Sequence, residues 1–267
     1  MPMERVPWGR MPTEVRSAVS RELGGESTVE DLTAGGNSAM ASLFTLVDGR
    51  QVFVKGMPGD HEQAGELELE RRINPHLPES APRLLWQVEA AGWTLLGFEG
   101  VAGGAYADFT VGSADLGRVV GALSALGVQG TPPPWLPTAW GRWGSYCSSE
   151  DEPLLTGETI AHTDPAAVNF LIGDGRAYLT DWAWPLVGPA WVDPTLWAMR
   201  LIVDGEQTPA EAYAWASKIP SFRGAPPRAL AVLAEAEARS WEHHHTHGVP
   251  GIESHVEGAR AWADHLA

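Results

Sequence analysis

The sequence predicts an α+β protein in which strands come first and helices follow. Up to about residue 100, short segments with alternating apolar and polar side chains are separated by glycine turns such as Asp48-Gly49 and Ala91-Gly92. Further along, apolar residues recur every three or four positions, as on one face of a helix. The glycine-rich run 101–104 separates the two patterns. We therefore expect a β-rich N-terminal part, residues 1–100, and a mainly helical part, residues 101–267.

Length and composition describe an ordinary globular chain. Its 267 residues, 44% apolar and 19% charged, are enough to bury a substantial core. No apolar run approaches the roughly 20 residues of a membrane span, and the first residues lack the apolar stretch of a signal peptide. The single cysteine, Cys147, excludes an internal disulfide framework. These features favour a cytoplasmic protein without membrane association.

The charge balance also limits the possible partners. A net charge of -16 argues against nucleic acid, which demands basic surface. It suits a cationic small substrate, although acidity also serves solubility. Of the 18 basic residues only Lys55 and Lys218 are lysine, so an ammonium at position 55 is notable.

The individual elements follow from periodicity and turn signals. In the N-terminal part we expect a helix over 13–23 and one running through Glu66 and Glu70, opened by a capping box at Asp60 and Gln63 and closed by Pro75. Strands are expected over 27–32, 40–47, 51–55, 82–89 and 93–98. Beyond residue 100, helices are expected over 113–126, 193–203, 209–218, 226–245 and 252–266. Ser113 and Asp193 are the expected N-caps of the first two.

Two further segments invite an assignment. The acidic stretch 148–153 is expected to form an exposed loop. The histidines of 243–247 suggest a metal site, but they lack a companion carboxylate or cysteine pattern and lie at a predicted helix end. We interpret them as a solvated helix terminus.

The segment 160–182 carries the residues with the clearest chemistry. Moving a phosphoryl group to a hydroxyl requires a carboxylate that orients and deprotonates the acceptor, and oxygen ligands for Mg²⁺. Asp164 is the candidate base, and Asn169 follows it by five residues as a candidate metal ligand. The turn at 173–175 predicts a hairpin that delivers Asp181 beside Asn169 as a second metal ligand. We expect His162 to brace the loop backbone.

The pattern His162-x-Asp164-x4-Asn169, followed by a hairpin and Asp181-Trp182, resembles the catalytic core of the aminoglycoside phosphotransferase-like kinases. This resemblance covers roughly residues 25–200. It implies a two-lobed protein-kinase-like fold with a small antiparallel β lobe and a larger, mainly helical lobe. It also implies that Asp193 ties the metal-binding loop to the helix behind it.

The resemblance extends to the expected nucleotide site. Val52-Phe-Val-Lys55 resembles the strand that places a lysine on the α- and β-phosphates of ATP. The family pattern of a Glu seven residues before Leu77-Pro78 selects Glu70 to hold that lysine, with Glu66 in reserve. The remaining expected cofactor-binding residues are a glycine-bearing turn on the phosphates and a hinge along the adenine: Gly35, Gly36, Asn37 and Ser38, then Phe98, Glu99 and Val101.

These expectations define a function and its alternatives. The resemblance implies an O-phosphotransferase that uses ATP or GTP with Mg²⁺ and acts on a hydroxyl of a small molecule. The acidic balance favours a cationic antibiotic such as an aminoglycoside. One alternative is a metabolic kinase of the choline, homoserine or sugar type, and the other is a catalytically silent kinase fold that only binds nucleotide.

Two departures from the family pattern concern the loop around Asp164. The family commonly has His-Gly-Asp, whereas this chain has Thr163 in place of the glycine. It also commonly has a polar or basic residue just past the aspartate, where this chain has Pro165-Ala166-Ala167. The loop segment itself therefore offers no cation to steady a transferring phosphoryl group.

Overall fold

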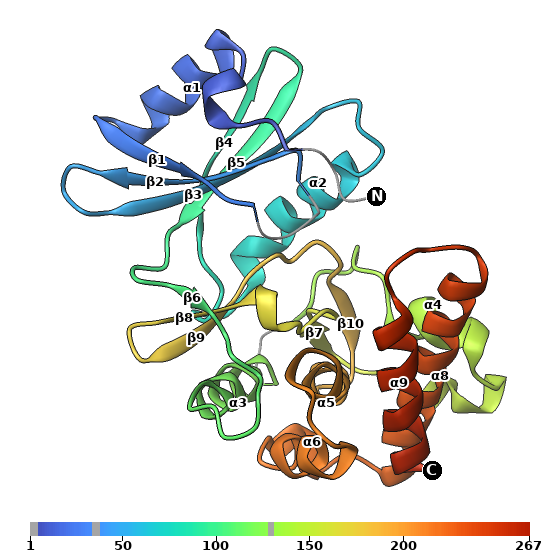
Figure 1. Ribbon diagram of the computed structural model, residues 1–267. Helices are drawn as coiled ribbons and strands as arrows, with labels where there is room; N and C mark the ends of the chain where they lie inside the picture. Colours follow the sequence, from blue (N-terminus) through green and yellow to red (C-terminus); the bar gives the residue numbers. More distant parts are fainter. Residues whose placement is uncertain (1–4, 34–37, 128–130) are drawn as a thin grey trace. The chain divides into compact units, whose positions relative to one another are not determined.

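The computed structural model describes residues 5–33, 38–127 and 131–267. The chain forms two compact units (Figure 1). The first comprises Met1–Gly104 together with Thr180–Ala183, and the second comprises Ala105–Leu179 together with Trp184–Ala267. None of the helices in the described ranges has the length and apolar character of a membrane span. The mixed α+β fold expected from the sequence is confirmed.

An antiparallel five-stranded sheet in the order β1-β2-β3-β5-β4 forms the centre of the first unit. Each predicted strand of this part is present, with small shifts at the ends. The strands are β1 Ser27–Asp31, β2 Met40–Leu46, β3 Gln51–Pro58, β4 Leu84–Ala90 and β5 Trp93–Glu99. The helices are α1 Thr13–Leu23 and α2 Ala64–Ile73.

Alternation along the strands determines which helix covers which face of this sheet. Val52, Val54 and Leu95 share a core with the apolar side of α1. Met57 and Leu96, at positions of the opposite parity, pack with Leu67 of α2. Lys55 has the same parity as Met57, so β3 directs its side chain toward the α2 face.

The predicted capping box at the start of α2 is wrong. The helix begins at Ala64, Gln63 is its N-cap, and no side chain caps it. Instead the preceding residues form a turn in which the backbone N–H of Gln63 donates to His61 Nδ1 and that of Ala64 to the His61 carbonyl. This turn occupies the positions that a capping box at Asp60 would need.

Helices and two small sheets make up the second unit. The helices are α3 Asp115–Leu126, α4 Ala139–Trp143, α5 Val192–Gly205, α6 Pro209–Ala216, α7 Pro220–Arg223, α8 Pro227–Thr246 and α9 Glu253–Leu266. The strands are β6 Ala105–Tyr106, β8 Phe170–Gly173 and β9 Arg176–Leu179 in the order β6-β8-β9, and β7 Thr159–Ala161 paired with β10 Leu186–Gly188. The buried rings of Phe109, Phe170 and Trp197 connect the β8–β9 hairpin to α5.

Three expectations for the second unit are corrected. Helix α3 begins at Asp115 with Ala114 as N-cap, and Ser113 only accepts the Asp115 N–H through its hydroxyl. The acidic stretch is not a loop but a 3₁₀-helix, Ser149–Leu154, because Ser148 and Asp151 form a capping box. Asp151 is buried and paired with Arg228 of α8.

Asp193 is likewise not an N-cap. Helix α5 begins one residue earlier, at Val192, and its N-cap is Trp191. The Asp193 carboxylate accepts backbone N–H groups of another segment, the loop after β7, instead of those of its own helix.

Candidate active site

In the first unit, Lys55 is held between two carboxylates. Its Nζ lies 2.5 Å from Glu70 Oε2 and 2.7 Å from Asp181 Oδ1. The Lys55 side chain is 8% exposed and that of Glu70 only 6%, so the pair is shielded from water. Burial opposes the charged ammonium, but Asp181 and Glu70 outweigh it, and the pKa of Lys55 lies above its ordinary value. Lys55 therefore stays protonated as a fixed cation.

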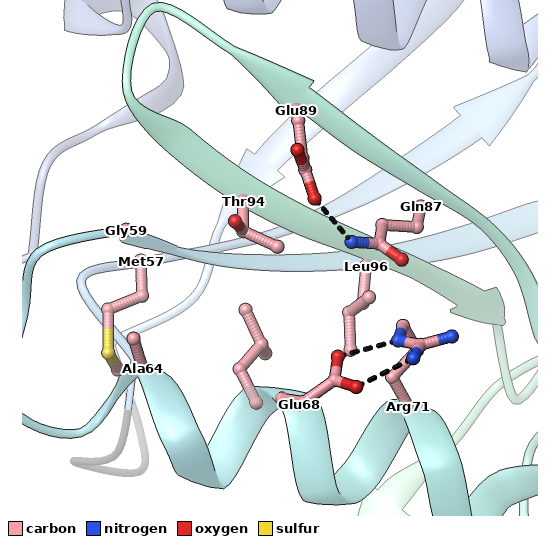
Figure 2. Close-up of a pocket in the computed structure, with 10 residues that line it drawn as sticks. Met57, Gly59, Ala64, Glu68, Arg71, Gln87, Glu89, Thr94 and Leu96 are labelled. Carbon is pink, nitrogen blue, oxygen red and sulfur yellow. Dashed lines mark hydrogen bonds and ion pairs between the residues drawn. The ribbon is translucent and has the colours of Figure 1, made fainter.

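The choice among the acidic residues of α2 follows from helix geometry. Glu70 points to Lys55, whereas Glu66, one turn earlier, is reached by the Gln63 amide at 3.5 Å. Glu68 turns to the other side, where it forms two hydrogen bonds with Arg71 (Figure 2). It lines a cavity of about 110 Å³ between α2 and the sheet. Lys55, Glu70 and Asp181 do not line this cavity, so it is separate from the candidate site.

Asp181 reaches Lys55 with an unusual backbone. Its φ is 62°, in the left-handed region that Asp tolerates better than most residues. The short segment Thr180–Ala183 belongs to the first unit, although the chain on both sides of it belongs to the second.

In the second unit, the candidate base Asp164 has both carboxylate oxygens engaged. Its Oδ1 accepts from Arg200 Nη2 at 2.5 Å, and its Oδ2 accepts from Asn169 Nδ2 at 3.0 Å. The Asn169 amide nitrogen also donates to the Asp164 carbonyl at 2.9 Å, which closes the loop between them. These bonds define the orientation of the carboxylate and direct the nitrogen of the Asn169 amide, not its oxygen, to Asp164.

Helix α5 holds the loop 162–167 at three points along its length. At its start, Asp193 accepts the backbone N–H groups of His162 and Thr163, both at 2.8 Å. In its middle, Arg200 binds Asp164. At its end, Asp204 accepts the N–H of Ala167 at 3.0 Å. The three residues are seven and four positions apart, which places them on one face of the helix.

The environment of Asp193 is nearly dry. Burial raises the pKa of Asp193, while His162 and the two backbone N–H groups act in the opposite direction. His162 is itself buried, and its Nδ1 accepts the N–H of Asp164 at 3.2 Å. It braces the loop backbone, as expected from the sequence.

Thr163, the residue that replaces the glycine of the family pattern, has a left-handed backbone with φ of 74°. This conformation is unfavourable for a β-branched residue. Its hydroxyl donates to the Trp184 carbonyl at 2.9 Å and accepts from Arg142 Nη1 at 2.6 Å. These two bonds, together with the bond from its N–H to Asp193, hold the strained conformation.

Of the residues expected to form the hinge, Phe98 and Glu99 end β5 and Val101 follows the strand. Phe98 is buried in the core beneath α2, and Glu99 is exposed. The N–H groups of Glu99 and Gly100 donate to the carbonyls of Arg83 and Gln51. Among the described residues, no backbone carbonyl accepts the Val101 N–H.

The expected glycine turn can be placed only in part. Gly35, Gly36 and Asn37 lie outside the described residues. Ser38 is described and is buried at the start of the segment leading into β2.

The histidines near the end of α8 contact one another and the backbone of their own helix. The rings of His243 and His247 stack at 4.1 Å, and His244 and His247 bond to backbone carbonyls one turn earlier. Across the described ranges, no group of three or more His, Cys, Asp or Glu is arranged to hold a metal ion.

Sequence reasoning missed Arg200 and the role of Asp204. A signal was present: Asp193, Arg200 and Asp204 recur at helical spacing within a mostly apolar segment, 192–205. Polar residues on one face of a buried helix need partners, which here are the loop groups.

Comparison with known proteins adds the fold class. No protein-family model matches the sequence, and no curated protein matches it. Solved structures do match over nearly the full length of both chains. Choline kinase LicA from Streptococcus pneumoniae has a TM-score of 0.56 at 17% identity, covering 94% of this chain and 97% of that one. The aminoglycoside phosphotransferase APH(4)-Ia, as a thermostable mutant, has 0.56 at 12%, covering 94% and 97%. Macrolide 2′-phosphotransferase MphH from Brachybacterium faecium has 0.54 at 14%, covering 92% and 96%.

At these identities the similarity concerns the fold. The resemblance inferred from the motifs is therefore confirmed for the fold. This chain has the protein-kinase-like fold of the choline kinases and of the aminoglycoside and macrolide phosphotransferases.

Proposed function

We propose that this protein is a small-molecule O-phosphotransferase that uses ATP or GTP with Mg²⁺. The observation that carries the proposal is the buried ammonium of Lys55 between Glu70 and Asp181, in a fold shared with phosphotransferases. An ammonium that stays charged while shielded from water binds anions strongly, and nucleotide phosphates are anions of this kind.

In the first unit, Lys55 would bind the α- and β-phosphates. Glu70 would keep the Lys55 side chain extended toward these phosphates. The Val101 N–H, at the hinge with Phe98 and Glu99, would bind the adenine or guanine edge. The turn with Gly35, Gly36, Asn37 and Ser38 would cover the phosphates with backbone N–H groups. A structure related in fold, APH(4)-Ia, has been solved with AMP-PNP and hygromycin B, which supports a nucleotide as the ligand.

The residues assigned to Mg²⁺ fit that ion. Mg²⁺ prefers oxygen ligands in near-octahedral geometry. We propose that Asp181 offers its carboxylate and Asn169 its amide oxygen, since the Asn169 amide nitrogen donates to Asp164. When bound, Mg²⁺ would neutralise the charge of the phosphates.

In the second unit, Asp164 would act as the base. Its carboxylate would accept a hydrogen bond from the acceptor hydroxyl and take the proton as the phosphoryl group moves. The transition state of phosphoryl transfer is loose, so the orientation of the acceptor contributes more than its early deprotonation. The two bonds to the Asp164 oxygens suit this task.

The acceptor is proposed to be a small hydroxylated molecule, with a cationic antibiotic as the first choice. The net charge of -16 supports a cationic ligand, and solved structures with this fold include aminoglycoside and macrolide phosphotransferases. Choline kinase LicA has the same fold, which keeps a metabolic acceptor as the second choice.

The test is a transfer assay with γ-labelled ATP and GTP. Choline, homoserine, a sugar, hygromycin B and a macrolide would each be offered with Mg²⁺ and, as a control, with EDTA. We expect the label to appear on one acceptor class in the presence of Mg²⁺ only. Nucleotide binding without transfer to any acceptor or to water would contradict the proposal and favour a silent kinase fold.

The two lysines of the chain provide a matched pair of variants. Lys55→Met should abolish transfer, because the phosphates lose their fixed cation. Lys218→Met should retain it, since Lys218 is exposed and lies over the Trp215 ring. Equal activity of both variants would contradict the assignment of Lys55.

A further inference from the structure

The environment of Asp164 contains a cation that the loop segment itself does not supply. Residues 165–167 are Pro, Ala and Ala, so no basic side chain follows Asp164 directly. Arg200 comes instead from α5 and bonds to Asp164 Oδ1 at 2.5 Å. Its side chain is only 12% exposed. A shielded guanidinium on one carboxylate oxygen limits the orientations that the carboxylate can adopt.

Arg200 is in turn held by α9 and α8. Its Nη1 is bonded to Nε2 of His255 on α9, and its guanidinium carbon lies 5.8 Å from the ring centre of Trp241 on α8. The Trp241 ring lies beside the His255 ring at 4.6 Å and donates its indole N–H to Glu237. Arg200 therefore has partners on two helices as well as in the loop.

The Arg200 bond also determines the state of His255. An arginine can only donate, so His255 Nε2 must accept and the ring proton must sit on Nδ1. Burial and the Arg200 cation lower the pKa of His255, while Asp204 and Asp164 act in the opposite direction. Arg200 and Asp204 of α5 and Asp164 of the loop are the charged groups that face this ring, and Trp241 of α8 packs on it. A protonated His255 would present a second donor to Arg200 and break their bond.

We propose that Arg200 is a positioning residue that fixes the Asp164 carboxylate for phosphoryl transfer, and that neutral His255 holds Arg200 in place. This inference rests on the proposed function, in which Asp164 is the base. Asn169 holds one carboxylate oxygen and Arg200 the other, so the lone pair directed at an acceptor hydroxyl is defined by both. Arg200 thus supplies, from a helix distant in the sequence, a cation beside Asp164 that residues 165–167 lack.

The kinetic test measures Mg²⁺-dependent release of phosphate from ATP, with water as the acceptor. For Arg200→Ala we expect kcat to fall by about 100-fold, as for a misplaced catalytic group, with KM for ATP unchanged. Arg200→Lys should recover part of the loss, because it keeps the charge but not the planar fork. Arg118→Ala is the control, since Arg118 forms a partly exposed pair with Asp115 within α3, away from Asp164. Full kcat in Arg200→Ala, or a higher KM for ATP without a change in kcat, would overturn the proposal.

His255→Gln tests the second half of the inference. Glutamine offers Arg200 an acceptor oxygen but does not titrate in this range. We expect the fraction of its neutral-pH kcat that this variant loses below pH 6.5, the ordinary pKa of histidine, to be smaller than the fraction that wild type loses. The same acid loss in both proteins would overturn the role of His255.

A readout independent of turnover separates this inference from the proposed function. NMR titration of ¹³C-labelled histidine should show His255 titrating at higher pH in Arg200→Ala than in wild type. An unchanged titration would overturn the network, whatever the activity. If Asp164→Asn turns over ATP at the wild-type rate, the proposed function fails. If Asp164→Asn is inactive while Arg200→Ala is fully active, only the role of Arg200 fails.

Discussion

Thr163 has a strained backbone conformation that the hydrogen bonds of its hydroxyl stabilise. Where the family pattern has a glycine, this chain places a β-branched residue at φ of 74°. A left-handed conformation costs such a residue on the order of 1–3 kcal/mol. The hydroxyl offsets this cost through its bonds to Trp184 and Arg142, which no glycine can make.

The contribution of the Thr163 hydroxyl to stability can be tested directly. Thr163→Val keeps the branched shape and loses both hydroxyl bonds, so we expect the free energy of unfolding to fall by about 2 kcal/mol. Thr163→Ser keeps the hydroxyl and should lie within about 0.5 kcal/mol of wild type. Urea unfolding of the three proteins measures this, and equal stability of the valine and serine variants would show that the hydroxyl contributes nothing.

His255 predicts how stability depends on pH. Its pKa is lowered in the folded protein, so the unfolded chain takes up the proton first as the pH falls. Stability should therefore be lost from about pH 6.5 downward, toward the folded pKa, and the loss should be smaller in His255→Gln. His265→Gln is the control variant, because His265 lies on the same helix and is exposed. Free energies of unfolding at neutral and mildly acidic pH test this, and an identical slope in His255→Gln would contradict it.

Among the secondary-structure elements, helix α5 is the one that holds the loop carrying Asp164. One of its faces carries Asp193, Arg200 and Asp204, and these bind successive groups of the loop 162–167. Most other residues of the helix are apolar and buried, so this face is fixed by packing before any ligand arrives. The loop thus takes its shape from the helix behind it.

Hydrogen exchange distinguishes the two ends of this face. Asp193→Ala leaves two buried N–H groups without their acceptor, at a cost of about 1–3 kcal/mol each, so exchange at His162 and Thr163 should rise strongly. Asp204→Ala should speed exchange at Ala167 only. If the exchange rates of the loop residues in both variants equalled those of wild type, α5 would not hold the loop.

Particular elements show what the sequence could predict. The strands, and the place of Lys55 on β3, follow from alternation and turn residues, which are local properties. The starts of α2, α3 and α5 were misplaced because each depends on how the preceding chain enters the helix. Arg200 was missed because its partner Asp164 is 36 positions away and no local pattern connects them.

In the whole molecule, the contact between Lys55 and Asp181 depends on the path of the chain and not on a single motif. The segment Thr180–Ala183 lies in the first unit while its flanks belong to the second, and it brings Asp181 to Lys55 across 126 positions of sequence. The motif spacing suggested such a pair through resemblance, and only the fold supplies the contact. The proposed division of labour, nucleotide in one unit and base in the other, follows from this path.

The central claim is that Asp164 serves as the base of a phosphotransferase. Asp164→Asn is nearly isosteric and removes the basic oxygen, so it is the most direct probe. With MgATP and the acceptor found in the transfer assay, we expect kcat to fall by about 10³-fold or more while the Kd for MgATP stays at the wild-type value. Wild-type kcat in Asp164→Asn, measured on the same acceptor, would contradict the account.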